Sequence, residues 1–293
     1  LLRWKAIVVA PGQCGIGRVG VSKLDEGTGD IPFGMIILKT PAEIEIMAEA
    51  SRVVAEVLEI IRKEVRPGVS TDELDRLAEK EILARGAVPA FKGYRKYPKT
   101  LCASVNEQVV HGLAGPRRVQ FGDIISLDVG VSFQGYIGDT AKTVAVGGCD
   151  LQAQKLIDVT EKALYEGISR AVPGGRVVDI SRAIQECVES HGFSVVREFV
   201  GHGVGRTVHE DPQVPNFVEA GKSSVKLKPG MTIAIEPMVN AGSAAVKVLS
   251  DKWTVVTQDG MPSAHMEHTV LITESEPEIL TCPENLPSLL RAR

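Results

Sequence analysis

The chain has 293 residues, of which 44% are hydrophobic and 24% are charged, and its formal net charge is −4. This composition is typical of a globular protein with a sizeable apolar core, and the acidic balance disfavours a general nucleic-acid binder. Five cysteines without a CxxC pair disfavour a disulfide framework and a structural zinc cluster. Because no apolar run approaches the roughly 18 residues of a membrane span, we expect a cytoplasmic protein without a membrane partner.

Residues 1–34 differ from the rest of the chain because they carry many glycines and no sustained hydrophobic period. The sequence GIGRVG at 15–20 has the GxGxxG spacing of a dinucleotide site, but the glycines and the proline that follow exclude the required helix. The glycines and the missing period predict a disordered extension at 1–34, and Leu1 in place of Met suggests a misassigned start. Met35 would then be the biological start, and a regulatory extension is the alternative.

Helix signals recur in two similar pairs downstream. Thr40-Pro41-Ala42-Glu43 and Ser70-x-x-Glu73 are capping boxes, each followed by apolar residues at helical spacing. The helix breaks at Pro67-Gly68 and Gly86 recur 106 residues later, at Pro173-Gly174 and Gly192. The strand sequence GDIISLD has a similar partner, GMTIAIE, 108 residues later. The sequence therefore predicts an α/β fold in one catalytic domain at 35–283, with pseudo-symmetric halves at about 35–150 and 151–283 and an unstructured tail at 284–293.

Each predicted half contributes a carboxylate from an otherwise apolar strand. Alternation places Asp128 and Glu236 opposite the large apolar side chains, on faces of small residues. A buried carboxylate needs a compensating cation, although a strand-end carboxylate facing water is the alternative. If the next strand returns through a two-residue loop at Gln134-Gly135, Asp139 becomes the diagonal neighbour of Asp128, with Cβ atoms roughly 7 Å apart. That separation suits carboxylates that share two cations about 3.5–4 Å apart.

Histidines add nitrogen ligands to this acidic set. The segment GHGVGRTVHEDPQ contains His202 and His209 but lacks the helical HExxH zinc motif, and the chain has no GxSxG serine-hydrolase motif. In AHMEHTVLIT, Glu267 would share a face with His265 and Thr269, whereas His268 points away and is interpreted as structural. Two Asp, two Glu and one or two His suit a pair of Mn, Fe, Co or Zn ions, and such pairs hydrolyse amides.

Five segments together resemble type I methionine aminopeptidases, namely SVNEQVVHG, LDVGVSFQGYIGDTAKT, GHGVGRTVHEDPQV, IEPMV and EHTVLIT. The resemblance extends from about Met35 to Thr281 and implies the pita-bread fold around two divalent metal ions. It implies that Asp128 chelates one ion. His202 and Glu236 would bind the other ion, and Asp139 and Glu267 would bridge both. The short interval between His202 and Glu236 fits type I, because type II enzymes carry a long insertion there.

The same resemblance implies roles around the metals. His111 and His209 would contact substrate without binding metal, and Glu236 would shuttle a proton. The loop FKGYRKYPK would border a pocket for the methionine side chain, lined by Tyr94, Tyr97, Cys102 and Trp253. An apolar wall suits an unbranched thioether. Cys102 could instead be an ordinary buried residue, and a single-strand nucleic-acid platform is disfavoured in an acidic chain. Phe91, in that loop, and Val208 depart from the residues that are common in the family.

The reaction that the resemblance implies is removal of the initiator methionine from nascent proteins and peptides when the second residue is small, with metal-activated hydroxide attacking the peptide carbonyl. One alternative is an Xaa-Pro aminopeptidase of the same fold, which would need a substantial N-terminal domain. The other is a non-enzymatic binding protein, which would be expected to have lost ligands. We expect a monomer that binds no sequence-specific nucleic acid, and we leave ribosome contact and the identity of the metal open.

Overall fold

The computed structural model describes residues 35–221 and 223–282, so the predicted extension at 1–34 and tail at 284–293 lie outside the described residues. The first predicted half contains α1 (Pro41–Glu64), α2 (Thr71–Ala84), β1 (Val88–Pro89), the 3-10 helix η1 (Tyr94–Lys96), β2 (Leu101–Val105), β3 (Gln108–Val110), β4 (Ile124–Phe133) and β5 (Tyr136–Ala145).

The second half contains α3 (Leu151–Ile168), α4 (Val177–Ser190), β6 (Ser194–Val195), β7 (Gly201–Gly203), β8 (Glu210–Val214), β9 (Thr232–Ile235), β10 (Met238–Asn240), β11 (Val246–Val248), β12 (Val255–Thr257), β13 (Ser263–His265), β14 (Glu267–Leu271) and β15 (Glu278–Ile279). Helix pairs therefore precede most of the strands in both halves. The division near residue 150 remains a prediction.

Local signals set the limits of the helices. Helix α1 begins after Thr40, whose side chain accepts a hydrogen bond from the Glu43 N–H while the Glu43 carboxylate accepts one from the Thr40 N–H. Helix α2 begins after Ser70 with the same reciprocal bonds. Gly86 and Gly192, which follow α2 and α4, have φ of 71° and 84° and take the left-handed conformation that ends a helix. These starts and stops confirm the predicted helix pairs.

Within the described residues, strands form one nine-stranded sheet and two sheets of three strands. The main path of the large sheet is β1-β4-β5-β14-β9-β7-β8, with β2 on β4 and β15 on β14, and the smaller sheets are β13-β10-β6 and β11-β12-β3. The two halves meet where β5 pairs with β14, at Ala141 opposite Glu267 and Thr140 opposite His268. This junction brings together acidic residues from distant parts of the sequence.

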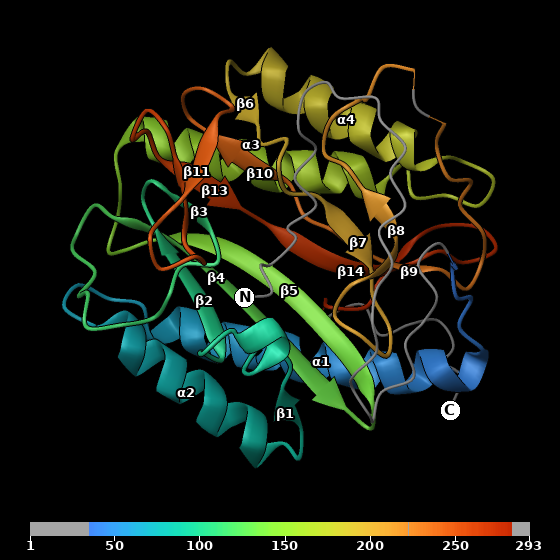
Figure 1. The fold of residues 1–293 in the computed structure, drawn as a ribbon, viewed down its shortest axis with the longest axis horizontal. Coiled ribbons are helices and arrows are strands. Elements are labelled where there is room, and N and C mark those ends of the chain that lie inside the picture. The colour runs from blue at the N-terminus through green and yellow to red at the C-terminus, as the bar shows by residue number, and fades with distance from the viewer. Residues whose placement is uncertain (1–34, 222, 283–293) are drawn as a thin grey trace, which may run out of the picture.

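Two helix layers flank the strands, with α1 and α2 on one side and α3 and α4 on the other (Figure 1). Helices α1 and α2 share an apolar core with β4, to which Ile125, Leu127 and Val129 contribute. Helices α3 and α4 share another core with β9, β13 and β14, to which Ile233 and Ile235 contribute. Because side chains alternate along a strand, the faces opposite these cores carry the predicted acidic residues. No helix in the described ranges combines the length and apolarity needed to cross a membrane.

Candidate metal centre

The β4–β5 hairpin positions the first two acidic residues. Its two-residue turn contains Gln134 and Gly135, and it pairs Asp128 with Ala141 and Gly130 with Asp139. The predicted diagonal arrangement of Asp128 and Asp139 is therefore confirmed. Their exposures are only 9% and 2%, so both carboxylates are removed from water.

Reciprocal hydroxyl bonds hold the next acidic residue beside this hairpin. The Thr140 hydroxyl donates to the carbonyl of Glu267, and the Thr269 hydroxyl donates to the carbonyl of Asp139, each at 2.8 Å. Glu267 is 3% exposed. These bonds lock the backbones that carry Asp139 and Glu267 to one another across the junction of the two halves.

His202 and Glu236 reach the same place from β7 and from the end of β9. The Nδ1 of His202 lies 2.9 Å from the carbonyl oxygen of Gly203, which can only accept, so Nδ1 carries a hydrogen and Nε2 is the atom that can bind a cation. Its Nε2, then a lone-pair atom, faces Oε1 of Glu236 at 3.3 Å. Two electron-pair donors at this distance favour a cation or a proton between them. Asn216 fixes the backbone of Glu236 by donating to its carbonyl at 3.0 Å.

Three of the predicted ligands form one cluster, which Glu236 adjoins through His202. Ligand atoms of Asp139, His202 and Glu267 all lie within 4.8 Å of one another. Among the described residues, none hydrogen-bonds to Oδ1 of Asp128, Oδ1 of Asp139 or Oε1 of Glu267, although all three oxygen atoms are buried. Buried acceptors without partners are costly, and this set of oxygens with one imidazole fits divalent ions such as Mn, Fe, Co or Zn.

The pKa values of the clustered carboxyl groups also indicate a cation site. Burial raises the pKa of Asp128 and of Glu236 to about 7. Burial, and then repulsion by neighbouring carboxylates, raises the pKa values of Asp139 and Glu267 well above their usual range. Four acidic groups in a dry site must bind protons or cations. The cluster is therefore suited to bind divalent metal.

Of the two predicted substrate histidines, His209 has a ring contact with the cluster through His202. The ring of His209 lies 4.3 Å from that of His202, and its Nδ1 is 3.1 Å from the phenol oxygen of Tyr94. His111 contacts Phe199 edge to face at 5.6 Å. Burial lowers the pKa of His111 to about 3 and holds that of His209 well below its usual range. Both rings are thus neutral near pH 7, and each carries one N–H donor.

The predicted pocket wall also assembles in one place. One apolar cluster contains Tyr94, Tyr97, Cys102 and Trp253 together with Phe91 and Val208. Cys102 pairs with Asp128 across β2 and β4, so the cluster adjoins the acidic residues. The ring of Phe91 packs on Gly130, where an added Cβ would lie 2.5 Å from it. The two unusual residues, Phe91 and Val208, therefore belong to the same apolar cluster as the predicted wall residues.

Three residues of this region have contacts that the sequence did not predict. Nε2 of His265 lies 3.5 Å from Oε2 of Glu236. Lys39 and Glu210 form a buried ion pair at 2.7 Å, and Glu210 also accepts the backbone N–H of Arg206, so the pair anchors the loop before His209. The only signals in the sequence were the alternation of His265 with Glu267 and the position of Glu210 beside His209.

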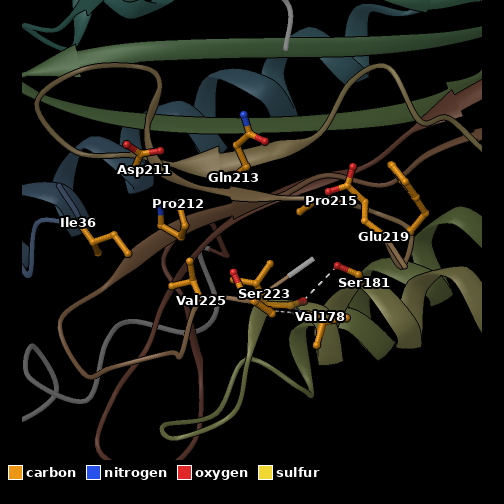
Figure 2. Close-up of a pocket in the computed structure, with 13 residues that line it drawn as sticks. Ile36, Val178, Ser181, Asp211, Pro212, Gln213, Pro215, Glu219, Ser223 and Val225 are labelled. Atoms are coloured by element: carbon orange, nitrogen blue, oxygen red, sulfur yellow. Dashed lines mark hydrogen bonds between the residues drawn. The ribbon is translucent and has the colours of Figure 1, made fainter. Parts of the chain in front are cut away.

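A cavity of about 320 Å³ lies elsewhere, between β8 and the N-terminal end of α4. In Figure 2, Asp211, Gln213 and Pro215 come from the β8 side, and Val178 and Ser181 come from α4. None of the predicted site residues lines this cavity. It is therefore distinct from the metal cluster.

Comparison with known proteins defines the class of this fold and site. Residues 45–274 match the sequence profile of metallopeptidase family M24, and the chain belongs to that family. It is 54% identical over 247 residues to methionine aminopeptidase 1 of Bacillus subtilis, covering 84% of this chain and 99% of the relative. It is 44% identical over 259 residues to the methionine aminopeptidase of Escherichia coli, covering 87% and 98%.

Solved structures agree with the sequence comparisons. The crystal structure of a methionine aminopeptidase from Thermotoga maritima has a TM-score of 0.82 and 49% identity, over 84% of this chain and 99% of that one. Prolidase from Pyrococcus furiosus has a TM-score of 0.67 at 24% identity, over 84% of this chain and 65% of that one, which is a likeness of fold alone. The comparisons confirm the pita-bread fold and the predicted resemblance to methionine aminopeptidases.

Proposed function

We propose that the chain is a methionine aminopeptidase that removes the N-terminal methionine of peptides and nascent chains when the second residue is small. The observation that carries this proposal is the cluster of His202, Glu236 and the three buried carboxylates of Asp128, Asp139 and Glu267, in which three carboxylate oxygens lack hydrogen-bond partners among the described residues. Membership of a metallopeptidase family and the names of relatives at 44–54% identity support it.

The metal centre that we propose holds two divalent ions, with the ligands Asp128, Asp139, His202, Glu236 and Glu267. Bound ions would polarise the peptide carbonyl and lower the pKa of a bound water. Glu236, which lies between the rings of His202 and His265, would accept a proton from the attacking water on a carboxylate oxygen and return it to the departing amine.

The neutral histidines would stabilise charge on the substrate. His209, held by the phenol of Tyr94, would donate its N–H to the oxygen that becomes negative during attack, and His111 would donate beside it. Because burial keeps both rings neutral, neither adds a positive charge that would compete with the metal ions. The assignment of His209 rests on the contact of its ring with that of His202, and the assignment of His111 rests on the resemblance.

The pocket wall would select the first residue of the substrate. Tyr94, Tyr97, Cys102 and Trp253 offer aromatic and sulfur surfaces, which suit a flexible thioether side chain. The Xaa-Pro alternative has weaker support, because the likeness to the prolidase from Pyrococcus furiosus is at 24% identity. We further propose that the enzyme acts in the cytoplasm as a monomer.

A peptide panel tests the proposed function. The full chain, loaded with Mn²⁺, is incubated with Met-Ala-Ser, Met-Leu-Ser, Leu-Ala-Ser and Ala-Pro-Ser, and the products are identified by mass spectrometry. We expect free methionine from Met-Ala-Ser, far less from Met-Leu-Ser, and no cleavage of the other two peptides. Cleavage of Ala-Pro-Ser alone would favour the Xaa-Pro alternative. Bound metal with no cleavage of any peptide would favour a binding protein.

A further inference from the structure

Two imidazoles flank the carboxylate of Glu236, one at each oxygen. His202 faces Oε1 at 3.3 Å, and His265 faces Oε2 at 3.5 Å. The side chain of His265 is 2% exposed, and no described residue forms a hydrogen bond with its Nε2. A polar nitrogen this deeply buried without a partner is costly, so its orientation toward Glu236 needs an explanation.

The backbone of His265 is held in place by a chain of hydroxyl groups. Thr143 Oγ1 accepts from the N–H of His265 and donates to its carbonyl, both at 2.8 Å. Because a hydroxyl has one hydrogen, the contact of 2.7 Å between Ser126 and Thr143 must use the hydrogen of Ser126. Ser126 and Thr143 lie on β4 and β5, so strands of the first half fix a histidine of the second.

The pairing of β10 with β13 brings His265 to Glu236. Met238, two residues after Glu236, pairs directly with His265. The imidazole therefore starts from a rigid sheet position and reaches a carboxylate that we assign to the metal centre. Its distance of 3.5 Å from Oε2 exceeds that of an ordinary N–H···O bond. Such contacts at active sites commonly shorten when the site is loaded.

We propose that His265 is a positioning residue for Glu236: its Nε2–H donates to Oε2, which fixes the plane of the carboxylate and keeps Oε1 on the side of His202. His265 itself touches neither substrate nor metal in this assignment. The inference rests on the proposed metal centre. Carboxylates that ligate metals are themselves hydrogen-bonded, and loss of such a partner typically costs 10–100-fold in metal affinity or activity.

Two substitutions at His265 and one matched control test this role in the full chain. Mn²⁺ alone is titrated into metal-stripped protein by calorimetry, and kcat and KM are measured with Met-Ala-Ser. We expect His265→Leu to weaken Mn²⁺ binding or lower kcat by about 10–100-fold with little change in KM. We expect His265→Gln, which keeps an N–H donor, to restore values near those of the wild type.

The control is His268→Leu, which removes a half-buried imidazole of the same region. His268 contacts the hydroxyl of Thr281 at 2.8 Å and not Glu236, so we expect wild-type Mn²⁺ affinity.

The proposal is wrong if His265→Leu behaves like the wild type, or if the control loses as much affinity. It is also wrong if His265→Gln loses as much Mn²⁺ affinity and kcat as His265→Leu. That result would mean that an imidazole nitrogen of His265 itself binds the ion. A wild type that binds Mn²⁺ but releases no methionine would contradict the proposed function, whereas the affinities would still decide the role of His265.

Discussion

Asp139 and Glu267 lie at the junction of β5 and β14, and both belong to the acidic cluster. No described residue hydrogen-bonds to the buried Oδ1 of Asp139 or to the buried Oε1 of Glu267. We predict that Asp139→Ala and Glu267→Ala each lower methionine release by about 10³-fold or more, because each removes a ligand proposed to bridge both ions. The metal-to-protein ratio, measured by elemental analysis, should fall in parallel. Asp158→Ala, at an exposed position of α3, is the control and should change neither quantity. Normal turnover with a full metal content in either variant would refute the assignment.

His209 has a different proposed role, which is to contact the substrate without binding metal. Its ring stands 4.3 Å from that of His202 yet is held by the phenol of Tyr94. We predict that His209→Ala lowers kcat by about 10²-fold, as expected for loss of one donor to a developing oxyanion, with an unchanged metal-to-protein ratio. A variant that loses its metal would instead identify His209 as a ligand.

At the scale of elements, α1 must approach β5 very closely for the cluster to form. A Cβ added at Gly138 would lie 2.6 Å from the backbone oxygen of Ala50 in α1. We predict that Gly138→Ala destabilises the protein by about 1–3 kcal/mol, because helix and strand must separate to admit one methyl group. Thermal unfolding of the metal-stripped protein measures this cost. Gly115→Ala, where the nearest atom is 3.9 Å away, is the matched control. Equal melting temperatures for the two variants would show that the contact is not tight.

The elements differ in how far the sequence alone could place them. Helix starts at Thr40 and Ser70 follow from side chains within three residues, and the β4–β5 register follows from a two-residue turn. These signals are local and could be predicted. The contact of His265 with Glu236 depends on how β10 pairs with β13, and no local pattern encodes that pairing. The pocket wall is predicted from resemblance alone, because it combines aromatic residues of one loop, Tyr94 and Tyr97, with Trp253 from a distant part of the sequence.

At the scale of the whole molecule, the acidic cluster should make the metal-free protein sensitive to pH. Folding raises the pKa of Asp128 from 3.8 to about 7, so between these values the folded state holds a proton that the unfolded state has released. The protonated Asp128 carboxyl therefore stabilises the folded state fully below about pH 4, and this stabilisation is lost as the pH rises to about 7. Histidines whose pKa is lowered, such as His111, contribute with the opposite sign, so a matched variant is needed.

Asp128→Asn isolates the effect of this one carboxylate. In metal-stripped protein we predict that the variant melts higher than the wild type, and that its advantage is larger at pH 7 than at pH 5 because the amide never ionises. With saturating Mn²⁺ the order should reverse, since the variant has lost a proposed ligand. An advantage that shrinks from pH 5 to pH 7 in the metal-free proteins would contradict the assigned burial of an ionisable carboxylate.

We propose above that the acidic cluster holds the metal that carries out hydrolysis. The most direct test is to titrate metal-stripped full chain with Mn²⁺ while methionine release from Met-Ala-Ser is followed by mass spectrometry. We predict no release without metal and full recovery at about two ions per chain, the number of ions that a dinuclear hydrolytic site holds. Undiminished release by the metal-stripped protein, or saturation with Mn²⁺ that restores none, would contradict the claim.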